Sequence, residues 1–296
     1  MTVQRPRLYL IDGSSYIFRA FFAVPPSSNC NGLPTNAILG FTNMLLKLLQ
    51  RHNPEYVAVA LDAGRETFRH RMFAAYKANR LAPPTALIPQ FPYCRKVLDA
   101  LDITLLELAG YEADDLVATL CKSLTAAECE IIVVSSDKDL TQLITDRVKL
   151  FDAGNERWIG VKEVHARFGV LPAQVIEVMG LMGDPVDNIP GVKGIGAKTA
   201  MALIQEFRTL ENLYERLDEV EKLRLRGALR IKKMLADGRT AAFMGRELAT
   251  VNTDAPIYVP LAELAARRPD LDKVRTLFTE LGFTNLIKIL EFAHAA

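Results

Sequence analysis

Short apolar runs rich in β-branched residues alternate with helical patterns through the first half of the chain. Residues 37–50 have the spacing of an amphipathic helix, and between residues 116 and 124 a leucine recurs at every fourth position. This alternation predicts an α/β fold in which a mostly parallel central sheet is flanked by helices. The runs expected to form strands are Leu8 to Ile11, Tyr56 to Leu61, Ile103 to Leu106, Ile131 to Val134 and Val148 to Phe151.

The pattern changes at about residue 161, where strand-like runs largely end and helical spacing continues. The helical pattern is interrupted by the segment GDPVDNIPGVKGIG, and no internal repeat is evident. We therefore expect an α/β core over residues 1–165 and a helical region over residues 166–296.

Residues 63–92 do not fit a tight connection between a strand and a helix. The segment is long, basic and aromatic, and it contains Pro83, Pro84, Pro89 and Pro92. Insertions of this size in a compact domain are usually functional or disordered. We expect it to form a mobile, helical arch over the edge of the sheet.

The composition of the 296 residues, 50% apolar and 24% charged, allows a sizeable core and excludes a disordered chain. The first apolar run is short and ends at Asp12, so it predicts neither a secretory signal nor a membrane span, and we expect a cytoplasmic protein. The four cysteines form no C-x-x-C pair and have no histidines nearby, which argues against a zinc site.

The net charge of +1 hides an uneven distribution. Residues 65–80 contain five Lys or Arg against one acid, and residues 222–239 contain seven against one. Each segment is either a solvated helix face or a contact to a polyanion, and charge alone does not decide between them.

Acidic residues follow the predicted strands at the point where each strand ends. Asp12, Asp62 and Asp137 come after three of the runs, and a fourth run leads to residues 112–115. Because the carboxyl ends of parallel strands meet at one edge of a sheet, these side chains are expected in one cleft. A single aspartate at such a place is more simply a turn or helix cap, and acids at residues 112–115 suit a helix N-terminus.

The joint pattern is harder to explain by capping, because crowded carboxylates repel one another unless cations neutralise them. Oxygen ligands without histidine or cysteine favour Mg²⁺ or Mn²⁺. Two such ions a few Å apart suit phosphodiester hydrolysis.

The interrupting segment resembles the helix-hairpin-helix pattern that binds a DNA backbone. Gly194 and Gly196 would let the main chain approach a phosphate, and Lys193 and Lys198 supply positive charge. The segment follows Asp184 and Asp187 directly, and these two could complete a second metal position.

Five blocks in order make the chain resemble the 5′ nuclease domain of bacterial DNA polymerase I and the related flap endonucleases. The blocks are LIDGSSYIFRAFFA, LDAGRETFRHRMFAAYKANR, GYEADD, SSDKDLTQLI and MGDPVDNIPGVKGIGAKTA. The resemblance implies two clusters of metal ligands. They are Asp12, Asp62, Glu112, Asp114, Asp115 and Asp137, and Asp139, Asp184 and Asp187.

The resemblance also implies that Lys77, Arg80, Arg69 and Arg19 contact the scissile phosphate. Tyr76 matches a position that stacks on the terminal base, although packing is the alternative for this ring. The residues expected to bind the DNA duplex are Val192, Lys193, Gly194, Ile195, Gly196 and Lys198, and the same hairpin is expected to hold K⁺ through backbone carbonyls. One departure from the family is LAPPTAL after the YKANR block, where relatives often carry acids.

The implied activity is two-metal hydrolysis of DNA that leaves a 5′-phosphate, as a 5′-3′ exonuclease and flap endonuclease in primer removal and repair. The implied partners are DNA with 5′ flaps, nicks or free 5′ ends, RNA primers, and a DNA polymerase that is either covalently linked or separate. No membrane partner is expected. Two alternatives are a non-catalytic DNA-binding paralogue and a phosphatase-like hydrolase in which a strand-end aspartate is the nucleophile.

Overall fold

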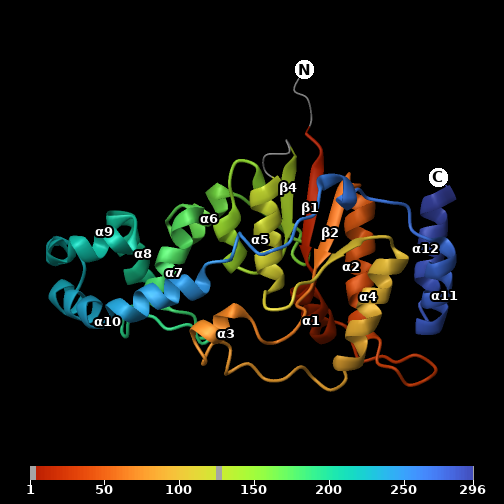
Figure 1. The fold of residues 1–296 in the computed structure, drawn as a ribbon, viewed down its shortest axis with the longest axis horizontal. Coiled ribbons are helices and arrows are strands. Elements are labelled where there is room, and N and C mark those ends of the chain that lie inside the picture. Colours follow the sequence, from red (N-terminus) through yellow and green to blue (C-terminus); the bar gives the residue numbers. More distant parts are fainter. Residues whose placement is uncertain (1–4, 125–128, 296) are drawn as a thin grey trace.

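One six-stranded sheet forms the centre of the computed structural model, which describes residues 5–124 and 129–295 (Figure 1). The strand order is β3-β2-β1-β4-β5-β6, with the first five strands parallel and β6 antiparallel to β5. The strands are β1 (Arg7–Asp12), β2 (Tyr56–Ala60), β3 (Thr104–Leu106), β4 (Glu130–Val134), β5 (Val148–Asp152) and β6 (Arg157–Ile159). The mostly parallel sheet and its five predicted strands are confirmed.

Alternate residues of β1 enter two separate cores, one on each face of the sheet. Leu8 and Leu10 pack in one core, and Tyr9 and Ile11 pack in the other. The first core includes α5 (Ala113–Leu124), and the second includes α1 (Gly13–Ala23), α2 (Asn36–His52) and α4 (Phe91–Ala100). Helices therefore flank both faces, as Figure 1 shows with α5 on one side of the strands and α2 and α4 on the other.

Most of the second half forms a helical unit at one end of the molecule (Figure 1). Gly245 and Gly180 allow α7 and α10 to pack closely, because a Cβ at Gly245 would lie 2.2 Å from the carbonyl oxygen of Pro190 and one at Gly180 would lie 2.7 Å from that of Ala242. The helices of the unit are α6 (Val161–Phe168), α7 (Val175–Met182), α8 (Ala197–Phe207), α9 (Leu210–Glu215) and α10 (Ala228–Ala249). Among the described residues, no helix combines the length and apolar character needed to cross a bilayer.

The last two helices, α11 (Leu271–Leu281) and α12 (Thr284–Ala295), lie beside α4 at the opposite end of the molecule (Figure 1). Val274, Phe278 and Leu281 form one apolar face of α11, and they join the core that contains α2 and α4. The division at residues 165 and 166 stays a prediction, but the helices after it do not all lie together in space.

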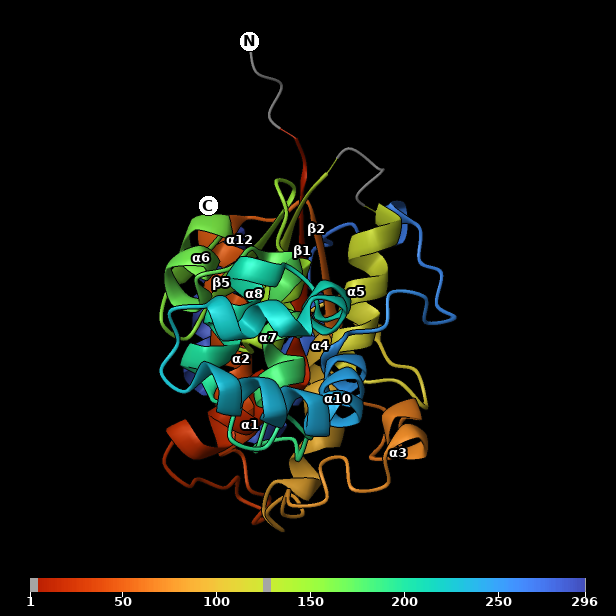
Figure 2. The ribbon, with the colours of Figure 1, turned by 90° about the vertical axis from the view of Figure 1, so that its left-hand side faces the viewer.

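The segment expected to form an arch crosses below the sheet and the helical unit (Figure 2). Its longest helix before α4 is α3 (Phe68–Met72), and most of the remaining residues form turns or irregular loop. Prolines at positions 83 and 84 limit helix there. The far end of the segment is held by Gln90, whose Oε1 accepts hydrogen bonds from the backbone N–H groups of Ala37 and Ile38.

Candidate functional site

A cleft at the carboxyl ends of the central strands is lined by carboxylates from five parts of the chain. Asp12 is the last residue of β1, Asp62 follows β2, and Asp137 follows β4. The acidic residues that line the cleft are Asp12, Asp62, Glu112, Asp114, Asp137, Asp139 and Asp187. An adjoining pocket shares Asp137, Asp139 and Asp187 and adds Asp184. Eight of the nine predicted ligand residues therefore gather at this edge of the sheet.

Hydrogen bonds with neighbouring serines hold the strand-end aspartates in place. Asp12 caps α1 by accepting from Ser15 N at 3.1 Å, and it also accepts from Ser135 Oγ at 2.8 Å. Ser135 Oγ in turn accepts from Asp137 N at 3.0 Å, and Ser14 Oγ accepts from Asp62 N at 2.9 Å. These serines were not among the predicted site residues, although they stand beside the aspartates in the blocks LIDGSS and SSDKDL.

The cleft is electrostatically costly for the acids that line it. Burial, with a further contribution from the charge of Asp62, raises the pKa of Asp12 to about 6. Burial and the charge of Asp137 raise the pKa of Asp139 to about 8, and one buried oxygen of Asp139 has no hydrogen-bond partner among the described residues. A cleft of carboxylate oxygens with raised pKa values suits a hard divalent cation, which would relieve the repulsion.

Basic side chains neutralise part of this charge. Lys77 Nζ lies 2.8 Å from Glu112 Oε1 and 3.8 Å from Asp187 Oδ2, and Arg80 Nε lies 2.9 Å from Asp187 Oδ1. Burial alone would lower the pKa of Lys77, but the charges of Glu112 and Asp187 outweigh it and raise that pKa. In this arrangement no three acidic side chains among the described residues converge closely enough to hold an ion.

Lys138 was not predicted as a site residue, although it stands between two predicted ligands. Its Nζ lies 2.6 Å from Asp184 Oδ2, so it neutralises the acid that lies in the adjoining pocket. The SSDKDL block does not indicate this contact, because Lys138 and Asp184 are 46 positions apart in the sequence.

Hydrogen bonds to backbone carbonyls join the base of the arch to the loop that carries Asp184 and Asp187. Lys77 N donates to Asp187 O at 2.9 Å, Asn79 Nδ2 donates to Pro185 O at 2.6 Å, and Asn188 Nδ2 donates to Ala75 O at 2.6 Å. Lys77 adopts a left-handed backbone conformation with φ of +53°. The position of the Lys77 side chain therefore depends on the acidic loop.

Asp115 lies behind the cleft, where it forms a buried ion pair with Arg69, one of the residues that line the cleft. Arg69 Nη1 and Nη2 each donate to a carboxylate oxygen of Asp115 at 2.8 Å, and Asp115 also accepts from the backbone N–H groups of Glu112 and Asn252. Asp115 is 0% exposed and Arg69 2%. In this arrangement both carboxylate oxygens of Asp115 accept hydrogen bonds, and the Arg69 guanidinium is held by Asp115 and by the carbonyls of Leu248 and Thr250. Asp115 thus has no open side for an ion and Arg69 does not point at a phosphate position, in contrast to the roles expected for them.

Two further residues lie differently from expectation. Tyr76 is 3% exposed, its hydroxyl donates to Glu112 Oε2 at 3.2 Å, and its ring packs edge-on against His70. The packing alternative describes this ring, because no face of it is free to stack on a base. Arg19 does not line the cleft and instead pairs with Asp152 at 3.3 Å.

The predicted hairpin connects α7 to α8. Val192 and Ile195 are buried, and Ile195 N donates to Val192 O at 2.9 Å, so these two side chains anchor the turn. Gly194 has φ of +89°, a region that favours glycine, and Gly196 is the N-cap of α8. Together with Lys193 and Lys198, which are exposed, the start of α8 has the features of an anion-binding helix end.

Comparison with known proteins gives two matching family models. One, described as 5′-3′ exonuclease, N-terminal resolvase-like domain, matches residues 7–169, and the other, described as 5′-3′ exonuclease, C-terminal SAM fold, matches residues 170–272. DNA polymerase I of Bacillus subtilis (strain 168) is 42% identical over 291 residues, which are 97% of this chain and 32% of that protein. A 5′-3′ exonuclease of Aquifex aeolicus (strain VF5) is 36% identical over 281 residues, 95% of this chain and 94% of that protein.

Solved structures have the same fold. The T5 D15 protein co-crystallised with metal ions has a TM-score of 0.68 at 25% identity, covering 82% of this chain and 89% of that one. The catalytic core of Rad2 in complex with DNA substrate has a TM-score of 0.60 at 18% identity, covering 95% and 89%, and shows the fold alone. This chain spans about a third of the length of the DNA polymerase I relatives that it matches. The two family models together extend from residue 7 to residue 272, and the chain therefore belongs to the 5′-3′ exonuclease family of nucleases.

Proposed function

We propose that this nuclease hydrolyses DNA phosphodiester bonds next to a free 5′ end or a 5′ flap, using two divalent cations. The observation that carries the proposal is the cleft of seven carboxylates beside Lys77 and Arg80. A non-catalytic DNA-binding protein would have no need to crowd acids whose pKa values burial and mutual repulsion raise. A phosphatase that used one strand-end aspartate as nucleophile would not need the remaining acids or the hairpin.

The acids divide into two groups that would each hold one ion, Mg²⁺ or Mn²⁺. The first group is Asp12, Asp62, Glu112, Asp114 and Asp137, and the second is Asp139, Asp184 and Asp187. When bound, such ions supply a nucleophile at neutral pH and stabilise the charge on the leaving oxygen. Asp115, which the resemblance places among the ligands, would act through Glu112, because it accepts from the Glu112 backbone N–H at 3.0 Å.

Lys77 and Arg80 would turn from the carboxylates towards the scissile phosphate once cations neutralise the acids. Carboxylates bound to the ions would attract Lys77 and Arg80 less strongly. Both basic side chains already lie in the cleft, where the phosphate would bind. A cation in a site that excludes water stabilises negative charge that develops during attack.

The hairpin and the start of α8 would hold the duplex part of the substrate through backbone N–H groups, Lys193 and Lys198, with K⁺ bound by carbonyls of the same turn. Phosphate contacts of this kind are independent of sequence, as a nuclease that recognises DNA shape requires. The proposed substrates are 5′ flaps, nicks and free 5′ ends of DNA, together with RNA primers. We further propose that the protein acts in the cytoplasm beside a DNA polymerase, either as part of the same chain or as a separate protein.

The proposal is tested by incubating the protein with a flapped DNA duplex and with a small phosphate ester, each with and without Mg²⁺. We expect cleavage of the duplex near the junction in Mg²⁺ only, with a 5′-phosphate on the product. Binding without cleavage would support the non-catalytic alternative. Hydrolysis of the ester in preference to DNA would support the phosphatase alternative.

A further inference from the structure

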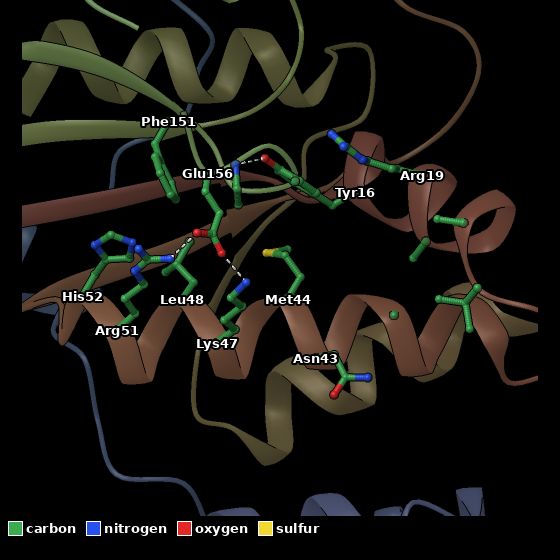
Figure 3. A pocket seen from close by; sticks show the side chains of 16 residues that line it. Tyr16, Arg19, Asn43, Met44, Lys47, Leu48, Arg51, His52, Phe151 and Glu156 are labelled. Carbon is green, nitrogen blue, oxygen red and sulfur yellow. Dashed lines mark hydrogen bonds and ion pairs between the residues drawn. The ribbon is translucent and has the colours of Figure 1, made fainter. Parts of the chain in front are cut away.

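A second pocket shares helix α1 with the carboxylate cleft (Figure 3). It lies between α1, α2 and the turn that joins β5 to β6, and its volume is about 250 Å³. We call it the α1–α2 pocket. Its walls are mainly apolar and include Ala20, Met44, Leu48 and Phe151. The pocket therefore offers an apolar surface for a flat group such as a nucleobase.

Basic side chains stand at the rim of this pocket. Lys47 and Arg51, one turn apart on α2, both pair with Glu156 of the β5–β6 turn, and Arg51 Nη1 lies 2.6 Å from Glu156 Oε2 (Figure 3). Exposure of these side chains ranges from 41% for Glu156 to 64% for Lys47. Ion pairs that are this exposed contribute little stability, so a phosphate could replace the Glu156 carboxylate.

The wall formed by the β5–β6 turn is fixed in place. Ala153 N donates to Tyr16 Oη at 2.9 Å, the bond drawn as a dashed line at Tyr16 in Figure 3. Gly154 lies against the Arg19 guanidinium, where a Cβ would come within 2.1 Å of Arg19 Cζ. Glu156 itself has φ of +52°, a conformation that an ordinary residue adopts only at some cost. The cavity is thus a formed feature of the fold, with Glu156 held across its rim.

Helix α1 connects the pocket to the cleft. Ser14 and Ser15 line the cleft, and Tyr16, Arg19 and Ala20 line the pocket. Ser15 and Arg19 are four residues apart, a rise of about 6 Å along a helix. This rise is less than two steps of a DNA strand at about 3.4 Å each. A strand with one phosphate in the cleft can therefore reach the pocket with a nearby nucleotide.

We propose that the α1–α2 pocket receives one unpaired nucleotide of the DNA substrate, close in sequence to the nucleotide at the cleft. The base lies on the apolar wall near Phe151, and its phosphate takes the place of Glu156 on Lys47 and Arg51. This inference rests on the proposed function, since it assigns a second binding position to the same substrate. Neither the carboxylates nor the hairpin takes part in it.

Two substitutions at the pocket have opposite expected effects. Glu156→Gln frees Lys47 and Arg51 and should tighten binding of a flapped duplex about threefold. Ala23→Trp, at an exposed position on the rim, should fill the pocket and weaken binding about tenfold, the loss expected for one stacked base. In the double variant the tightening should disappear, because both changes act on one bound nucleotide. Matched controls are Asp99→Asn, which removes another exposed ion pair, and Ala262→Trp.

The base that enters the pocket can be identified with a series of flapped duplexes in which one abasic nucleotide is placed at successive positions, by measuring how tightly each duplex binds. One position should weaken binding to the parent protein and leave binding to Ala23→Trp unchanged. Equal responses at every position, or weaker binding by Glu156→Gln, would overturn the proposal. Should Ala23→Trp fail to fold by circular dichroism, Glu156→Gln and the abasic series on the parent decide.

The same substrates separate this inference from the proposed function. If the parent cleaves the flapped duplex in Mg²⁺ but the pocket variants bind like their controls, only the pocket assignment is wrong. If the parent cleaves no flapped duplex, the proposed function itself fails.

Discussion

Arg69 donates two parallel hydrogen bonds to Asp115, each 2.8 Å long, in a site that is closed to solvent. Arg69 also donates to the backbone carbonyls of Leu248 and Thr250. The pair therefore joins α3, the start of α5 and the end of α10. The ion pair is strong because two parallel hydrogen bonds join the guanidinium to the carboxylate. Removal of either partner would leave a buried charge uncompensated.

Asp115→Asn should destabilise the protein by about 3–5 kcal/mol, the cost of breaking a buried ion pair. The matched control is Asp137→Asn, which removes a carboxylate from the cleft, where acids repel one another, and should cost little or nothing. Urea unfolding without divalent cations measures both. Equal stability of the two variants would contradict the positioning role of Asp115.

Asp137→Ala should abolish cleavage while binding of the duplex survives, because the cleft and the hairpin lie in different parts of the fold. Loss of a metal ligand removes several kcal/mol of transition-state stabilisation, about a thousandfold in rate. Single-turnover cleavage of a flapped duplex and its dissociation constant test this together. Cleavage near the parent rate would exclude Asp137 from the metal site.

Lys77→Ala should lower the single-turnover rate far more than it raises the dissociation constant, because its proposed interaction strengthens as charge develops on the phosphate. Arg71 is exposed on α3 and serves as the comparison. Arg71→Ala should weaken binding modestly and reduce the salt slope by about one unit. If Lys77→Ala showed only this binding and salt effect, Lys77 would be an electrostatic guide and not the catalytic cation.

Gly196→Val should weaken binding to the duplex without loss of stability. Apart from its two neighbours in sequence, none of the residues that the structure describes has a heavy atom within 4 Å of a Cβ added at Gly196, whereas one at Gly194 would meet Met234 Sδ at 2.7 Å. A side chain at Gly196 would hold the backbone away from a phosphate. Binding of a flapped duplex should suffer more than cleavage of short single strands, and equal losses on both would argue against a duplex-binding hairpin.

Glu130 provides a pH test away from the cleft. It pairs with Arg7 of β1 at 3.2 Å and with Lys149 of β5. Burial would raise its pKa, but the hydrogen bond and charge of Lys149, with those of Arg7, lower it below the ordinary 4.5. Its stabilising contribution is therefore present above pH 4.5 and lost as pH falls through the lowered pKa.

Glu130→Gln should accordingly cost about 0.5–1 kcal/mol at neutral pH, and the difference from the parent should shrink below pH 4.5. Urea unfolding at a series of pH values checks the sign. A difference that grew on acidification would show that the Glu130 pKa is raised in the folded protein.

The carboxylate cleft could be predicted from the sequence because it depends on local pattern alone. Strand runs end at Asp12 and Asp62, and parallel strands bring those ends together. The role of Asp115 could not be predicted in this way, because it depends on a backbone N–H group at Asn252, 137 residues later. From the sequence, Asp115 differs in no visible way from Asp114.

Other features could not be predicted because they depend on which parts of the chain pack against each other. Tyr76 follows a basic segment and looked available to a base, but Glu112 and His70 enclose it. Helical spacing after residue 161 favours helices in this region, but it does not indicate that the apolar face of α11 packs against α4. The short strand β6 contributes three residues, too few for a periodic signal.

The contacts between Lys77, Asn79 and residues 185–188 cross the boundary between the two matching family models, which meet at residues 169 and 170. A fragment that ended at Gly169 would keep Asp12, Asp62 and Lys77 but lose the acceptor that fixes the Lys77 backbone. Neither portion by itself contains all the acids that line the cleft. If one portion were exchanged between distant relatives, the residues that form the contacts between the base of the arch and residues 185–188 would therefore have to be changed together.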